Sequence, residues 1–170
     1  SPITMDTLRC VVLWVEFAVF VGYATNKTPI FCDNKEEKPM DGTGINADVL
    51  RFFAQHPDAL PLYETLAQRV FRTVENTVIK VQKTQISFYN RRLFACVSFA
   101  RVRKKADCPE PFLVVTFGLD HKVESPRVDV ATEPYPNRWT HHVLISNTAE
   151  IDDELMGWIQ EAGRFAAAKR

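Results

Sequence analysis

A series of short apolar runs between residues 78 and 145 constrains the fold of this chain more than any other feature. The runs are rich in β-branched and aromatic residues and are separated by polar turns, a pattern typical of β-strands. Two of them flank the polar triplet Asn90-Arg91-Arg92, which predicts a hairpin. The runs span residues 78–81, 85–89, 93–99, 112–117 and 141–145, with an additional strand at 127–131 as an option. We expect a mainly antiparallel sheet of about four to five strands.

Helical patterns stand on both sides of this strand region. Asn46 can cap a first helix that ends at about His56, because Pro57 follows. Asp58 precedes a second helix with apolar residues at helical spacing. The chain ends in a long helix from about Glu150 to Ala168, capped by Asn147 or Thr148. Helices, then clustered strands, then a helix predict an α+β fold with two N-terminal helices and a long C-terminal helix packed on the sheet.

Residues 1–40 do not fit this pattern and form an extension of uncertain status, which leaves 41–170 as one α+β domain. Residues 10–24 are almost entirely apolar, but Glu16 interrupts them. A stretch of about 15 residues is short for a membrane helix, so we expect no membrane span. Self-association through residues 10–24 is one role that such an apolar segment can have. A polar stretch with Pro29, Pro39 and Gly42 follows and resembles a linker.

Composition narrows the setting of the protein without identifying a partner. Lys and Arg total 21, as do Asp and Glu, so the whole-chain charge does not indicate nucleic acid or an anionic membrane. The four cysteines are sparse and irregularly spaced, which predicts reduced thiols and a cytoplasmic protein. No motif predicts a metal site or a cofactor.

Local charge is the strongest chemical signal. No Asp or Glu occurs between Lys80 and Ala106, while eight basic residues do: Lys80, Lys83, Arg91, Arg92, Arg101, Arg103, Lys104 and Lys105. Basic residues on a hairpin attract nucleic acid, a phosphorylated ligand or an acidic protein surface. The competing interpretation is a solvated edge, because lysines and arginines on edge strands also prevent aggregation.

A second candidate site lies on the first strand of the predicted hairpin. Lys83, Gln85, Ser87 and Tyr89 are two residues apart, so in a strand they share a face opposite Ile86 and Phe88. This polar face either lines a site for an anionic or amide-bearing ligand or faces water.

The third candidate site comprises Arg127, Trp139, His141 and His142. Adjacent histidines in a strand point to opposite faces, so the pair is poorly arranged to bind one metal ion. A histidine with a carboxylate partner such as Glu133 can act as a general base. No serine or cysteine lies in a nucleophile motif that such a base would serve. Trp139 beside the Pro134 and Pro136 bend is expected to be a packing anchor.

Several segments, in this order, resemble one known family: KTQISFYNRRLFACVSF, PFLVVTFGL, ESPRVD, PYPNRWTHHVLIS and ELMGWIQEA. They are similar to the domain-of-unknown-function family numbered 5655, over roughly Leu60 to Phe165. The resemblance implies a small α+β domain of the kind found beside other domains in bacterial proteins. It implies no activity.

Three functions are compatible with these patterns. The first is a non-enzymatic binding or accessory module that docks an anionic partner through the basic hairpin, and we favour it. The second is an enzyme for a small anionic substrate, in which Lys83, Arg92 or Arg127 holds charge and His141 or His142 moves a proton. The third is a structural or assembly role.

Overall fold

The computed structural model of this chain describes residues 45–168 and places six strands in one sheet. The strand order is β1-β2-β3-β4-β6-β5, and every neighbouring pair is antiparallel. The strands are β1 (Val78–Val81), β2 (Gln85–Tyr89), β3 (Leu93–Ser98), β4 (Leu113–Leu119), β5 (Val130–Tyr135) and β6 (Arg138–Ile145). The α+β class and the antiparallel sheet are confirmed, while the expected four to five strands were too few.

The sixth strand belongs to a hairpin that the two prolines obscured. β5 and β6 pair up to Tyr135 and Arg138, and the turn between them places Asn137 at a φ of 59°. Asparagine tolerates this left-handed conformation better than most residues. Pro134 fits because β5 is an edge strand, which can lack a backbone donor on its outer side. The bend at the prolines is therefore the hairpin itself.

Three α-helices complete the described chain: α2 (Ala47–Phe52), α3 (Leu60–Thr73) and α4 (Asp153–Ala168). Asn46 caps α2 as expected, since its side chain accepts a hydrogen bond from the Val49 amide at 3.0 Å. α2 ends at Phe52, earlier than the expected His56, because the amides of Ala54 and His56 bond to the carbonyls three residues back and so continue the chain as turns. A 3-10 turn (Pro57–Ala59) then leads into α3. Asp58 lies in that turn and does not cap α3.

The C-terminal helix begins later than predicted. Asn147 caps a separate 3-10 turn (Thr148–Glu150), and its side chain accepts a hydrogen bond from the Glu150 amide at 3.2 Å. Asp152 accepts from the Leu155 amide at 3.0 Å and so caps α4 itself. The expected start near Glu150 is therefore three residues too early.

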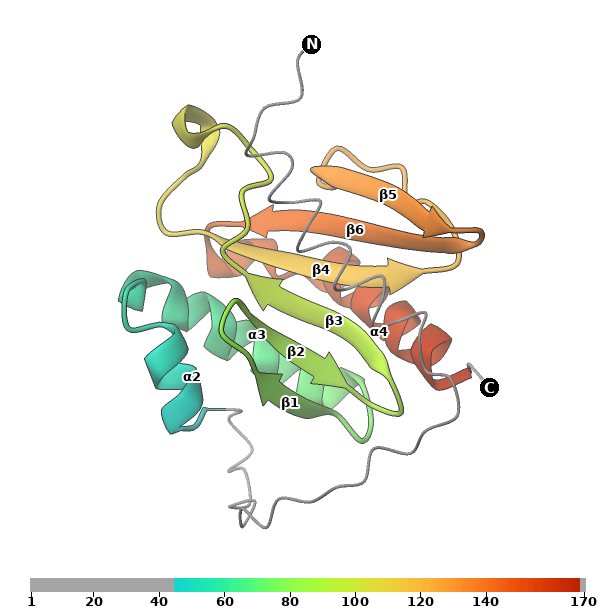
Figure 1. Cartoon of the computed structure of the whole chain (residues 1–170), viewed down its shortest axis with the longest axis horizontal. Helices are drawn as coiled ribbons and strands as arrows, with labels where there is room; N and C mark the ends of the chain where they lie inside the picture. The colour runs from blue at the N-terminus through green and yellow to red at the C-terminus, as the bar shows by residue number, and fades with distance from the viewer. Residues whose placement is uncertain (1–44, 169–170) are drawn as a thin grey trace.

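The main core lies between the sheet and α3 and α4, which pack side by side behind it (Figure 1). Ile86 and Phe88 in β2 face this core, as their alternation predicted. Leu155 and Ile159 of α4 are fully buried, which confirms the predicted apolar face of the last helix. α3 and α4 approach closely at Gly163, where an added Cβ would lie 2.8 Å from Val74 Cγ1.

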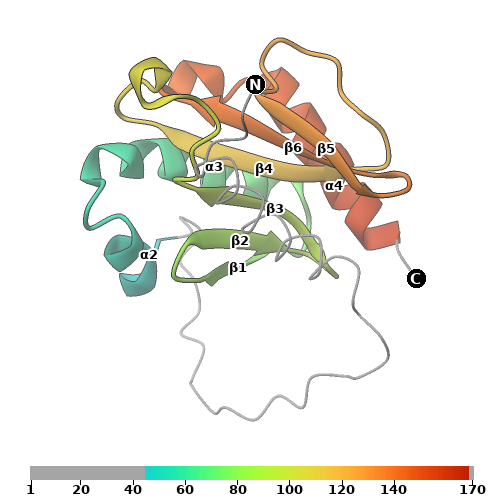
Figure 2. The same ribbon diagram turned by 45° about the horizontal axis from the view of Figure 1, so that its top comes forward.

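The two central strands are buried on both faces. Every residue of β3 is buried, and so is every residue of β4 except Gly118. Figures 1 and 2 show α3 and α4 on one face only. We call the opposite face, to which Cys96, Val114 and Leu144 point, the second face of the sheet.

No helix within residues 45–168 has the length and apolar character needed to cross a membrane. The predicted extension of residues 1–40, with its apolar segment 10–24, lies outside the described residues.

Candidate functional site

A row of polar and sulfur-bearing side chains crosses the second face of the sheet. Ser87, Cys96, Thr116 and His142 are direct partners across β2, β3, β4 and β6. Directly opposed residues of antiparallel strands point to the same face, so these four side chains form one line, which we call the polar row. The sequence analysis singled out only the two ends of the row, Ser87 and His142. Cys96 and Thr116 join them through the pairing of the strands, which the sequence does not reveal.

Hydrogen bonds link three members of the polar row, Cys96, Thr116 and His142, and join Ser87 to two nearby glutamines. Thr116 Oγ1 lies 2.8 Å from His142 Nδ1, and the Thr116 hydroxyl also interacts with the Cys96 thiol. At the other end, Gln85 Nε2 donates to Ser87 Oγ at 2.8 Å, and Ser87 Oγ donates to Gln82 Oε1 at 3.1 Å. The polar groups thus satisfy one another.

Gln85, Ser87 and Tyr89 share this face, as the alternation predicted, but Lys83 does not join them. Lys83 lies in the turn between β1 and β2 and is exposed. Ser87 is fully buried, so the interpretation of a water-facing strand surface is wrong at this position. The predicted combination of a lysine with this polar face is therefore not present.

Burial keeps the polar row uncharged near neutral pH. Desolvation raises the pKa of the Cys96 thiol to about 12, although the hydrogen bond with Thr116 opposes the shift. Desolvation likewise lowers the pKa of His142 to about 4 and raises the pKa of Tyr89. A neutral thiol is a poor nucleophile, and a neutral imidazole carries no charge to stabilise a thiolate. The arrangement suits packing and neutral hydrogen bonding better than thiol catalysis.

His141 points to the opposite face, which confirms the prediction that the two histidines diverge. Its ring stacks on Phe117 at a centroid distance of 5.0 Å, and its Nε2 accepts a hydrogen bond from the Val123 amide at 3.0 Å. His141 is fully buried, and desolvation lowers its pKa to about 4. Glu133, the suggested carboxylate partner, instead accepts a hydrogen bond from the Asn137 amide.

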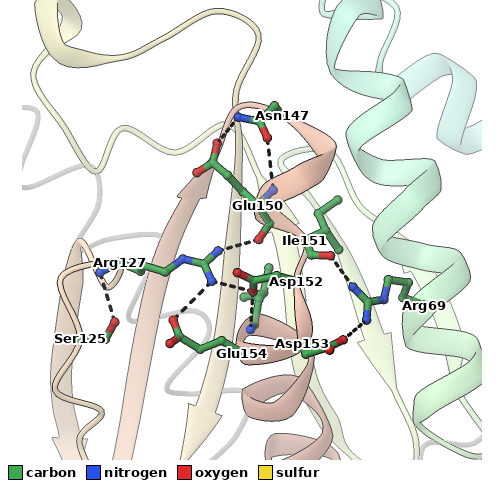
Figure 3. Close-up of polar contacts among 10 residues, drawn as sticks. Arg69, Ser125, Arg127, Asn147, Glu150, Ile151, Asp152, Asp153 and Glu154 are labelled. Atoms are coloured by element: carbon green, nitrogen blue, oxygen red, sulfur yellow. Dashed lines mark hydrogen bonds and ion pairs between the residues drawn. The ribbon is translucent and has the colours of Figure 1, made fainter.

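Arg127 belongs to a structural junction at the start of α4 (Figure 3). Its Nη1 donates to Asp152 Oδ1 at 2.7 Å and to Glu154 Oε1 at 3.3 Å, and its Nη2 donates to the Glu150 carbonyl at 2.6 Å. Its guanidinium carbon lies 5.9 Å from the centre of the Trp158 ring. These contacts use the donors that an anionic substrate would need, and they join the segment before β5 to α4.

Trp139 lies apart from this junction. It pairs with Leu119 across β4 and β6, and the ammonium group of Lys122 lies 5.9 Å from the centre of its ring. The structure therefore does not gather Arg127, Trp139, His141 and His142 into one site.

The basic residues divide between the two ends of the sheet. Gln85 pairs with Ser98 at one end, so the turn with Lys83 and the loop after β3 lie at that end. Tyr89 pairs with Leu93 at the other end, where the Asn90–Arg92 turn lies. Four residues of strand separate the ends by about 13 Å. The predicted basic hairpin is thus not one continuous charged surface.

The Asn90–Arg92 turn between β2 and β3, which we call the hairpin tip, contacts α4. Asn90 Nδ2 donates to the Gly163 carbonyl at 2.8 Å, and Arg91 Nη1 donates to the Ala167 carbonyl at 3.4 Å. Arg91 remains exposed, and Arg92 is half-buried.

The other end carries the exposed cations, and we call it the basic end. Lys83 lies in the β1–β2 turn, and Lys104 and Lys105 lie in the loop between β3 and β4. None of these three lysines makes an ion pair with another residue in the range 45–168. Arg103, by contrast, pairs with Asp129 at 2.6 Å, and this contact anchors the loop to the start of β5.

Sequence reasoning missed one cluster with metal-binding residue types. Asp120, His121 and Glu161 place potential ligand atoms within 4.8 Å of one another. His121 contacts Asp120 through Nδ1 at 2.7 Å and Glu161 through Nε2 at 3.5 Å. Both ring nitrogens thus face carboxylates at an exposed surface. Only the packing of α4 brings Glu161 to His121, and no spacing in the sequence indicates it.

Comparisons with known proteins identify a family but no activity. A family model described as "Domain of unknown function (DUF5655)" matches residues 51–166. No curated protein and no solved structure matches the chain.

Proposed function

The chain belongs to the DUF5655 family, whose description names no activity, and we propose that it is a non-enzymatic binding module that docks an anionic partner at the basic end of its sheet. The observation that carries this proposal is the position of Lys83, Lys104 and Lys105. All three are exposed at the same end of the sheet, without an ion-pair partner in the part of the chain that the structure describes.

The shape of the basic end favours an extended partner. Lys83 lies beside the edge strand β1, whereas the 3-10 turn Lys105–Asp107 stands toward β6, beyond β4 (Figure 1). The three lysines therefore line an end of the molecule and do not converge on a small ligand. Asp107 and Glu110 follow in the same loop, so the positive charge is limited to the first part of the loop. A polyanion such as a nucleic acid strand or an acidic polypeptide matches this distribution.

The enzymatic alternative receives less support. It requires Lys83, Arg92 or Arg127 beside a histidine, but Arg127 binds three acceptors at the start of α4. His141 and His142 point to opposite faces, and burial keeps both neutral.

We also propose a cytoplasmic location, because Cys96 and Cys108 are free thiols.

The test is a titration of the whole chain with labelled single- and double-stranded oligonucleotides and, separately, with polyglutamate, at low and near-physiological salt. We expect Lys104→Glu with Lys105→Glu to weaken binding by roughly tenfold or more. With nucleic acid, it should also reduce the slope of log affinity against log salt by about 2, because each phosphate contact contributes about one unit.

The matched control is Arg72→Glu with Arg164→Glu, which makes the same change in net charge at exposed positions of α3 and α4. It should affect binding less than the loop variant does. Equal losses of affinity in both variants would show that binding depends on the net charge of the protein and not on the basic end. No binding of either polyanion at low salt would refute the proposal. A selective loss with Arg91→Glu would move the site to the hairpin tip.

A further inference from the structure

The second face of the sheet is buried, although the described helices lie elsewhere. Val114 is 0% exposed, and Cys96 and Leu144 are each 3% exposed. None of these three side chains belongs to the main core beneath α3 and α4. Leu93 and Cys96 form a separate apolar cluster with Tyr89 packed against it. An antiparallel sheet with a solvated second face would instead alternate apolar and polar residues in its central strands.

The described residues cover only one end of this face. The loop between β3 and β4 turns toward β5 there, where Arg103 binds Asp129 and Asp129 Oδ2 accepts a hydrogen bond from the Leu144 amide at 2.9 Å. α2 contacts β1 at the opposite edge of the sheet. In the two views, no helix or strand of residues 45–168 lies over the centre of the second face (Figures 1 and 2). The helices and strands of residues 45–168 therefore do not explain why Cys96 and Thr116 are buried.

We propose that the apolar segment 10–24 packs on the second face and covers the polar row. The segment has the matching chemistry, since all of its residues except Glu16 and Gly22 are apolar or aromatic. Burying it against Leu93, Cys96, Val114 and Leu144 removes apolar surface of both partners from water, which is the main favourable term in packing.

The length of the chain permits this position. The described chain begins at Ile45, which packs against the main core just before α2. From α2, beside β1, the centre of the second face is two to three strand spacings away, or about 10–15 Å. The 20 or so residues between the segment and Ile45 span about 25 Å on average as a flexible chain. A helix of about 15 residues is about 22 Å long, close to the width of four strands at about 19 Å.

This placement assigns a role to the polar row. Thr116 has a hydrogen-bond partner within the row, in His142, and Ser87 has partners in Gln82 and Gln85, so apolar side chains can cover the row without leaving these hydroxyls unpaired. Packing of segment 10–24 on its own sheet also competes with self-association, because the segment cannot contact its own sheet and a second molecule at the same time.

The first experiment measures thiol protection in the full chain. With Cys10, Cys32 and Cys108 replaced by serine, Cys96 should react slowly with a thiol reagent such as dithiobis(nitrobenzoate). Val15→Asp with Val19→Asp should release the segment and increase that rate at least tenfold, while α3 and α4 amides stay protected from hydrogen exchange. Thr28→Asp with Thr43→Asp adds the same charge to the linker region and should leave the rate unchanged. Equal rates in all three chains would overturn the proposal.

A second experiment decides the matter if the Val15→Asp, Val19→Asp variant unfolds. A spin label on Cys10, with the other three cysteines replaced, should broaden amide signals of β3, β4 and β6 more than those of α3. The broadening should persist when labelled protein is diluted with unlabelled protein of natural isotope composition. Broadening that is lost on this dilution, and that is also seen in a mixture of spin-labelled and isotope-labelled molecules, would show that a second copy occupies the face. Absence of any broadening of the sheet signals would show that the segment lies elsewhere. Either result overturns the proposal.

Discussion

At the scale of single residues, burial determines the chemistry of the side chains that the sequence marked as reactive. His141 and His142 are adjacent in β6, yet one stacks on Phe117 and the other contacts Thr116. Both are neutral at pH 7, because removing the imidazolium from water costs more than the available partners return. Histidines in these positions contribute to stability in a pH-dependent manner.

His141 provides a direct test of this dependence. Its pKa is 6.5 in the unfolded chain and about 4 in the folded protein. The unfolded state therefore takes up the proton first, so the full stability is present above pH 6.5 and is lost as the pH falls toward 4. We expect His141 to account for about 2 kcal/mol of the stability lost between pH 7 and pH 5.

The measurement is urea unfolding of the wild type and of His141→Phe at both pH values. Phenylalanine preserves the stack on Phe117 but leaves the Val123 amide without its acceptor, which lowers stability at both pH values alike. The drop between pH 7 and pH 5 should be smaller by about 2 kcal/mol in the variant. An unchanged drop would mean that His141 is protonated equally in the folded and unfolded states.

Two glycines of α4 should respond in opposite ways to the same substitution. Gly157→Ala meets no atom within 4 Å, so the higher helix propensity of alanine should stabilise the protein by up to about 1 kcal/mol. Gly163→Ala brings its Cβ to 2.8 Å from the stiff side chain of Val74, and we expect a net loss of about 1–3 kcal/mol. Thermal or urea unfolding measures both. Val74→Ala should relieve part of the second loss, and a stabilising Gly163→Ala would show that α3 and α4 are farther apart.

At the scale of elements, the position of α4 depends on contacts at its first turn. Arg69 of α3 donates to the Ile151 carbonyl and to Asp153, and Arg127 donates to Asp152 from the other side (Figure 3). Two elements far apart in the sequence thus meet at one helix start. The acidic residues there also favour the positive end of the helix dipole, as the sequence predicted.

Two neighbouring aspartates allow the effect of the helix cap on stability to be compared with the effect of a surface charge. Asp152 both caps α4 and binds Arg127, so Asp152→Ala should lower the unfolding free energy by about 1–2 kcal/mol. The Asp153 side chain is exposed to solvent even where it pairs with Arg69, so Asp153→Ala should leave the unfolding free energy nearly unchanged. Chemical denaturation of the two variants gives the comparison. Equal effects would mean that the cap contributes little beyond general charge.

At the scale of the whole molecule, topology divided the basic run. Residues 80–106 look like one charged segment, but antiparallel strands reverse direction at each turn and so carry neighbouring turns to opposite ends of the sheet. Lys83, Lys104 and Lys105 thereby come to one end, and Arg91 comes to the other. The binding surface that we propose is consequently smaller than the hairpin that the sequence suggested, and its lysines lie in turns that strand pairing positions.

By itself, the sequence determined the features that depend on local periodicity. The alternation in 85–89 identified Ile86 and Phe88 as core residues, the spacing in 150–168 identified the buried face of the last helix, and Asn46 marked the start of α2. These features depend on the backbone geometry of a few consecutive residues, and the spacing of apolar and polar side chains along the sequence indicates that geometry.

Only the tertiary structure decided which distant residues meet. It paired Cys96 with Thr116 and His142, joined Arg127 to Asp152, and placed Glu161 beside His121. It also showed that Pro134 lies in the edge strand β5, which is the sixth strand, and that Pro136 lies in the turn that joins β5 to β6. Strand order and register depend on the combined burial of all the elements, and one-residue shifts exchange the faces of a strand. The periodicity of the sequence does not contain that information. For this reason the fold class was predicted correctly, whereas the residues predicted to form one site lie apart in the structure.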